Sequence, residues 1–153
     1  MRADLPYAVL LFRGRGLISR LIRWQTRSCY SHAALRLPTG QIIEAWPGKG
    51  VHLTTLADYT GVDVFTVPSA ARHQWEWAIS YARGQVGRGY DYWGVLRFIS
   101  RDNLPDSERW FCSELVFAAL HQAGVHLLKR VPSWAVTPRD LSLSPLLHAA
   151  HES

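Results

Sequence analysis

Apolar and polar residues follow two rhythms along this 153-residue chain. In the first half, short apolar runs rich in β-branched and aromatic residues alternate with Gly, Pro and polar residues, which is the pattern of strands joined by turns. We predict strands over residues 7–14, 31–37, 41–46, 50–56 and 62–67. The sequence Pro-Thr-Gly between the second and third of these strands predicts a hairpin.

The other rhythm is helical, with apolar residues three or four positions apart. It predicts helices over residues 17–27, 69–87, 90–100 and 110–123. Ser69 is a candidate N-cap for the second helix, which Gly84 or Gly87 would end, and Gly124 would end the last. The polar residues 101–108 predict a loop.

The order of these elements predicts an α+β fold with an antiparallel sheet packed against helices. The length suits one domain over residues 1–153, which would bury about 70% of the surface of the unfolded chain. Repeats, low-complexity tracts and linkers are absent from the sequence.

Composition narrows the classes of protein and partner. The hydrophobic share of 48% and the charged share of 19% are those of a soluble globular protein. The net charge of +5 favours anionic partners, but the basic residues are scattered, and we expect no nucleic-acid partner. Seven Trp residues predict an aromatic core or a groove lined with rings. The sequence leaves the oligomeric state open.

The two cysteines and the N-terminal segment indicate a compartment. Two cysteines do not form a disulfide framework, which favours a reducing environment, and Cys29 is expected to be a free, partly buried thiol. The apolar run at residues 7–12 is too short for a signal peptide, and no run is long enough to span a membrane. We therefore expect a cytoplasmic protein. Contact of the amphipathic residues 17–27 with a membrane surface stays open.

Cys112 is the candidate for nucleophilic chemistry, because it begins an apolar helical run in "ERWFCSELVFAA". A helix N-terminus and a neighbouring imidazolium both favour the thiolate, which is the reactive form of cysteine. The same pattern also suits a cysteine that merely packs in the core.

His32 and Glu44 are the candidates for a base and its partner. His32 lies within a predicted strand among small residues, and Glu44 interrupts the apolar strand "QIIEAW", where a carboxylate needs a partner. A hairpin with the three-residue loop 37–39 would place these two residues directly opposite each other, about 5 Å apart. A loop with an even number of residues would instead put them on opposite faces.

Five segments together resemble a known family. They are "YSHAALRL", "IIEAWPGKGV", "GRGYDYWGV", "WFCSELVFAALHQAGV" and "TPRDLSLS". They are similar to the circularly permuted papain-like cysteine hydrolases of the NlpC superfamily, in particular the YiiX/YebB-like group, over roughly residues 7–144. The histidine strand precedes the cysteine helix in the permuted order, as it does here.

The resemblance implies roles for four residues. Cys112 would be the nucleophile, His32 the general base and Glu44 the polar third member. Tyr90, in the Gly-x-x-Tyr of residues 87–90, would lie near the oxyanion or the substrate, although a ring that packs the groove wall remains open. No metal or organic cofactor is implied.

The resemblance also implies a class of reaction. It is an amidase, peptidase or acyl esterase that forms an acyl-enzyme on cysteine, with a peptide or an acyl-lipid substrate of possibly anionic character. A lipid acyltransferase of the same fold and a non-catalytic binding module that retains the fold are the alternatives.

Overall fold

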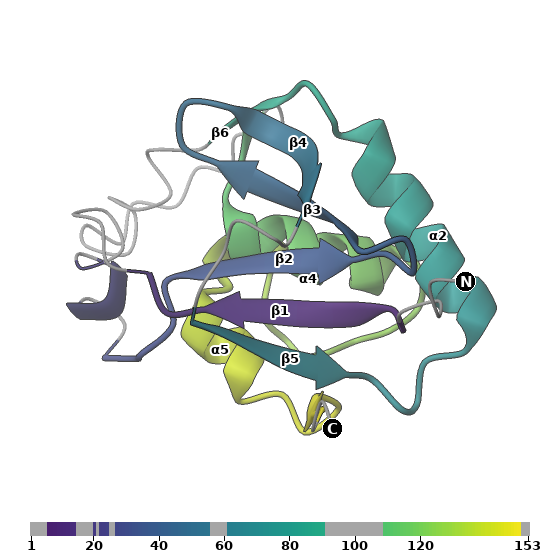
Figure 1. Ribbon diagram of the computed structural model, residues 1–153. Helices are drawn as coiled ribbons and strands as arrows, with labels where there is room; N and C mark the ends of the chain where they lie inside the picture. Colours follow the sequence, from purple (N-terminus) through teal and green to yellow (C-terminus); the bar gives the residue numbers. More distant parts are fainter. Residues whose placement is uncertain are drawn as a thin grey trace.

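The computed structural model describes residues 6–14, 20, 22–24, 27–55, 61–90 and 109–150. Its centre is a six-stranded antiparallel sheet in the order β4-β3-β2-β1-β5-β8 (Figure 1). The strands of this sheet are β1 (Ala8–Phe12), β2 (His32–Arg36), β3 (Gln41–Trp46), β4 (Gly50–Thr55), β5 (Val62–Thr66) and β8 (His148–Ala149). A second, parallel pair joins β6 (Gly89–Tyr90) to β7 (Arg109–Trp110). The predicted α+β class and five of its strands are confirmed.

The predicted helices 69–87 and 110–123 are present with shorter bounds, and the second begins at Cys112 because Arg109 and Trp110 form a short strand. Among the described residues the helices include α2 (Arg72–Gly84), α4 (Cys112–Gln122), the 3-10 turn η2 (Ser133–Ala135) and α5 (Pro138–Ser142). Figure 1 shows α4 behind the sheet and α2 beside it. Gly124 follows α4 with a positive φ of 83°, which glycine adopts without strain, and confirms the predicted helix end.

The N-cap of α2 is a correction. Pro68 and Ser69 lie in a turn closed by the N–H of Ala70 and the carbonyl of Val67, so the helix begins later and Ala71 is the N-cap. The side chain of Gln74 accepts the hydrogen bond from the Ala71 N–H.

Several predictions lie wholly or partly outside the described residues. In the predicted helix 17–27, residues 20 and 22–24 are helical. The predicted helix 90–100 and the loop 101–108 fall outside, apart from Tyr90, which belongs to β6. Within the described part of the chain, no helix is long and apolar enough to cross a membrane.

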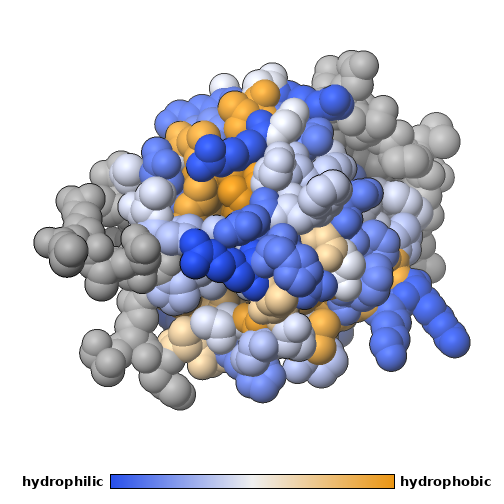
Figure 2. Space-filling model, turned by 90° about the vertical axis from the view of Figure 1, so that its right-hand side faces the viewer, coloured by the Kyte–Doolittle hydropathy of each residue, from blue (hydrophilic) through white to orange (hydrophobic). Residues whose placement is uncertain are grey.

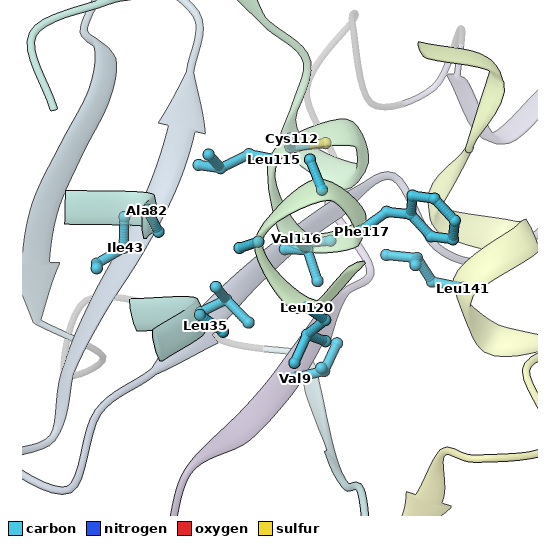
Figure 3. Close-up of a cluster of buried hydrophobic side chains, with 14 of the residues drawn as sticks. Val9, Leu35, Ile43, Ala82, Cys112, Leu115, Val116, Phe117, Leu120 and Leu141 are labelled. Carbon is cyan, nitrogen blue, oxygen red and sulfur yellow. The ribbon is translucent and has the colours of Figure 1, made fainter. Parts of the chain in front are cut away.

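The main core lies between the sheet and the helices. Figure 3 shows α4 at its centre, surrounded by side chains from β1, β2, β3, α2 and α5. Every residue of α4 from Cys112 to Leu120 is buried. Because Leu35 and Ile43 pair across β2 and β3, their side chains share the face that this core covers.

The opposite face of the sheet holds a smaller apolar cluster and the polar residues of the strands. The cluster contains Ala8, Leu10, Phe12, Ala34 and Ile42. Glu44 alternates with core residues along β3 and therefore belongs to this second face. His32 alternates likewise but is the first residue of β2, and it interacts both with Glu44 and with Cys112 at the start of α4.

The hairpin between β2 and β3 corrects the predicted register. Leu35 pairs with Ile43 and Arg36 with Ile42, so the loop is residues 38–40, one residue later than predicted. Gly40 has a φ of 85°, and its N–H bonds the Leu37 carbonyl. A three-residue hairpin loop needs such a left-handed residue at its last position, and glycine fills it. The loop length stays odd, so His32 and Glu44 share a face as diagonal neighbours, not as a directly opposed pair.

Candidate active site

His32 is held in place at the first position of β2. The Ser31 N–H bonds the Phe12 carbonyl at 2.9 Å, which extends the pairing of β1 and β2 by one residue beyond His32. The Ser31 hydroxyl in turn accepts from the Gly14 N–H at 3.1 Å. The segment before the strand is thus anchored to the end of β1, which fixes the backbone that carries the imidazole.

Tyr30, the residue before Ser31, bonds to the neighbouring strand β5. The Tyr30 hydroxyl donates to Asp63 of β5 at 2.6 Å, and Arg13 makes an ion pair with the same carboxylate at 2.8 Å. Burial, the hydrogen bond to Asp63 and its charge raise the pKa of Tyr30. The phenol therefore remains a donor across the physiological pH range.

Glu44 is the polar centre of the site. Its side chain is fully buried, yet both oxygens have partners: Oε2 accepts from His32 Nε2 at 2.6 Å and Oε1 from His52 Nε2 at 3.0 Å. The bond to a carboxylate makes Nε2 of His32 the protonated nitrogen and leaves Nδ1 for another group. The structure thus brings His32 and Glu44 into the contact that the sequence predicted.

Cys112 is the first residue of α4 and is 1% exposed. Its N-cap, Phe111, has an extended backbone and supplies no side-chain hydrogen bond to the first helical N–H groups. Those N–H groups and the helix dipole favour negative charge at this end. Cys112 also interacts with His32 closely enough to raise the pKa of that imidazole.

The contacts with Cys112 and Glu44 raise the pKa of His32. Burial alone lowers the pKa of an imidazole, but the hydrogen bonds and charges of Cys112 and Glu44 outweigh it and raise the pKa from 6.5 to about 9. The raised pKa favours the protonated form of His32 at neutral pH.

Aromatic rings confine the imidazole. The Trp46 ring meets His32 edge-on with centroids 4.9 Å apart, and the Phe12 ring lies tilted against it at 5.0 Å. Contacts of this kind restrict rotation of the imidazole, because the rings leave it no room to turn away from Glu44.

Tyr90 lies beside the cysteine helix. It is 6% exposed, pairs with Trp110 across the two small strands, and its ring is tilted against Phe111 at 6.0 Å. A cavity of about 470 Å³ opens next to it, lined by the turns at residues 48–50 and 87–89. Gly50 must be glycine here, since a Cβ would come within 2.2 Å of the Arg88 carbonyl oxygen.

A second cavity, of about 390 Å³, lies between the start of β1 and α2, with Tyr7 and Trp75 in its wall. The Tyr7 and Trp75 rings stack with centroids 5.6 Å apart. Figure 2 faces this side of the molecule, where hydrophobic patches are interrupted by hydrophilic side chains. His32 lies at the other end of β2, so this cavity is remote from the candidate site.

No cluster of three or more His, Cys, Asp or Glu side chains suited to a metal ion occurs within the described ranges. The nitrogens of His32 and His52 that face Glu44 are engaged with its oxygens at hydrogen-bond distance.

His52 was not predicted from the sequence as a residue of the site, and the exposure of Cys29 was predicted wrongly. His52 lies directly opposite Glu44 in the β3–β4 pairing. Applying the hairpin argument to the next turn, Pro-Gly-Lys, would have found it. Cys29, expected to be partly buried, is free and exposed, because Tyr30 is the residue of that segment that bonds to the sheet.

Comparison with known proteins finds one matching family and a solved structure of similar fold. A family model described as "Permuted papain-like amidase enzyme, YaeF/YiiX, C92 family" matches residues 8–132. The fold is similar to a crystal structure described as metalloprotein YiiX from Escherichia coli O157:H7, with a TM-score of 0.72 and 17% identity, covering 100% of this chain and 99% of that one. No curated protein matches the sequence.

Proposed function

The chain belongs to the permuted papain-like amidase family of YaeF and YiiX, and from this premise we propose that it is a cysteine amidase with Cys112 as its nucleophile. One observation carries the proposal: His32 bonds through Nε2 to the buried Glu44 at 2.6 Å and also interacts with Cys112, the first residue of a helix. A nucleophile, a base and a group that orients the base are the parts that such chemistry requires.

The proposed reaction begins with the thiolate of Cys112 attacking the amide carbonyl carbon. The developing oxyanion is stabilised by the Cys112 backbone N–H and the N-terminal end of α4. The imidazolium of His32 gives its Nδ1 proton to the leaving amine as the C–N bond breaks, which produces a thioester and a neutral imidazole. His32 then removes a proton from water, which attacks the thioester and returns the free thiolate and the acid product.

Glu44 and Tyr90 have supporting roles in this proposal. Glu44 fixes the imidazole tautomer and compensates the positive charge that His32 carries before the amine leaves. Tyr90 borders the cavity between the turns at residues 48–50 and 87–89, and its ring lies against Phe111, the residue before Cys112, so it would contact a substrate that enters this cavity.

We further propose that the substrate is a peptide or acyl amide with an anionic group. Lys49 and Arg88 line the cavity at Tyr90, and the whole chain carries a net charge of +5. Cations at the mouth of a cavity attract negatively charged substrates over several ångströms.

The test compares chemical classes of substrate under reducing conditions. The protein is incubated with acyl amides, peptides and acyl esters, each with and without a carboxylate, beside Cys112→Ser and His32→Gln. Release of the amine by the intact chain alone, with a covalent acyl adduct on Cys112 by mass spectrometry, is the expected result.

Two other outcomes would overturn parts of the proposal. Turnover of esters with transfer to an added amine or alcohol would favour acyl transfer over hydrolysis. Equal turnover by the wild type and Cys112→Ser would remove Cys112 as the nucleophile.

A further inference from the structure

We infer that His52 is a positioning residue that holds the Glu44 carboxylate in the orientation that His32 requires. The inference rests on the proposed function of Cys112, His32 and Glu44, and it adds a residue that lies outside this set of three. It starts from the fact that one buried carboxylate serves two imidazoles, each through a different oxygen.

The burial of Glu44 makes the second contact necessary. Its side chain is fully buried on a strand between Ile43 and Ala45, which are also fully buried. An ionised carboxylate in such surroundings is stable only when donors satisfy its oxygens. His32 reaches Oε2, and His52 supplies a donor to Oε1 at 3.0 Å.

The β3–β4 hairpin fixes His52 more firmly than the β2–β3 hairpin fixes His32. Glu44 and His52 are a directly opposed pair in a ladder that runs without interruption from Gln41↔Thr55 to Trp46↔Gly50. Gly48, with a φ of 81°, lies in the turn that sets this register. Glu44 and His32, in contrast, are diagonal neighbours, so the carboxylate must lean along the sheet to reach the catalytic imidazole.

The two imidazoles therefore have different tasks. The His32 side chain is 7% exposed and interacts with Cys112. The His52 side chain is 21% exposed and lies on β4, which β3 separates from β2. Donors on both oxygens restrict rotation of the carboxylate about its last bond. With Oε1 bound to His52, rotation would break that hydrogen bond, and Oε2 stays directed at His32 Nε2. His52 thus acts on the reaction through Glu44.

The experiment compares His52→Phe, which keeps a ring without a donor, with His52→Gln, whose amide N–H reaches as far as Nε2 and can donate to Oε1. We expect kcat of His52→Phe to fall about tenfold, with KM changed less than twofold, because an outer partner of a histidine–carboxylate pair has been removed. His52→Gln should recover most of this loss. His73→Phe, which removes an exposed histidine from α2, is the matched control and should behave as the wild type.

A second measurement needs no turnover. In protein labelled with ¹⁵N-histidine, the proton on His32 Nε2, which is shared with Glu44, should resonate far downfield. It should shift or broaden in His52→Phe and return in His52→Gln, with circular dichroism confirming that both variants are folded.

The outcomes separate this inference from the proposed function. If His52→Phe leaves the His32 signal unchanged, or if Gln recovers no more than Phe does, His52 has no positioning role. If no amide or ester is hydrolysed by the wild type while the His32 signal responds as expected, the proposed function fails and the positioning of Glu44 stands.

Discussion

The two faces of strands β2 and β3 carry opposite chemistry over the same few residues. Toward α4 they present Ala33, Leu35, Ile43 and Ala45, all fully buried and apolar. On the other face the alternate positions include His32, Arg36 and Glu44, which are also almost wholly buried but polar. The period of two in a strand allows one segment to anchor the core and to present a reactive group.

The difference teaches how a buried polar group is kept functional. The apolar face depends on packing, which tolerates any side chain of suitable volume. The polar face depends on specific partners: His32 with Cys112 and Glu44, Glu44 with two imidazoles, and Arg36 with the Pro6 carbonyl at 3.3 Å. Loss of one partner on this face leaves another buried polar group in need of it. Substitutions on the two faces should consequently differ in kind.

The largest effect is expected on the polar face. His32→Gln retains an N–H that can bond Glu44 but cannot act as a base, so amide hydrolysis should fall by roughly a thousandfold or more. The variant should stay folded, and kcat/KM with a responsive substrate, together with circular dichroism, measures both. Residual activity within tenfold of the wild type would show that His32 is not the base.

The counterpart on the apolar face is Leu35→Ala. Leu35 is fully buried against α4, and its truncation should lower the free energy of unfolding by about 2–5 kcal/mol. The activity of the molecules that remain folded should change little. Leu53→Ala, which alters a side chain 38% exposed on β4, is the control and should cost less than about 0.5 kcal/mol. Urea unfolding gives both values, and equal losses for the two variants would contradict the comparison.

The two cysteines allow a smaller contrast to be measured within one molecule. Cys29 is exposed and Cys112 is buried, so accessibility alone favours Cys29. At pH 6 a free thiol reacts slowly because little of it is thiolate, whereas a thiolate paired with an imidazolium remains reactive. We expect a small reagent such as iodoacetamide to alkylate Cys112 faster, on the order of tenfold, by peptide mass spectrometry. His32→Gln should abolish the preference, and faster labelling of Cys29 in the wild type would reject the activated thiolate.

The sequence alone predicted the five long strands and the helices α2 and α4, and it drew attention to His32 and Glu44, because these features leave local signals. Strands of alternating or continuous apolar residues and a glycine after α4 were local features, and His32 and Glu44 stood out as polar residues in apolar strands. The exact register of the β2–β3 hairpin could not be predicted from the apolar pattern of the two strands. It depended on whether Thr39 or Gly40 would end the turn, which is decided by the need for a positive φ at Gly40.

His52 shows a different reason for an incomplete prediction. Its strand, "GVHLTT", is partly exposed, and a histidine there fits an ordinary solvent-facing position. Only its pairing and hydrogen bond with Glu44 identify it as a residue of the candidate site. Similarly, the contact of Cys112 with His32 joins residues 80 positions apart in the sequence, and its existence depends on how α4 packs against the sheet.

The smallest expected effect concerns the stability of the polar face as pH changes. The pKa of His32 is raised from 6.5 to about 9, against the effect of burial, by the hydrogen bonds and charges of Cys112 and Glu44. Between these two pH values His32 is protonated in the folded chain and deprotonated in the unfolded chain, so the contribution of His32 to the free energy of unfolding falls as pH rises. The contribution of His32 is complete below pH 6.5 and is lost by the time the pH passes about 9.

His32→Gln lacks this proton, and the stability difference between the wild type and the variant should therefore shrink steadily from pH 6 to pH 9 in urea unfolding. Cys112→Ser, which removes one of the groups that raise the pKa, should show the decline over a narrower range. A difference that is constant, or that grows with pH, would mean that His32 is not held as an imidazolium and that its face of the sheet is stabilised by neutral hydrogen bonds alone.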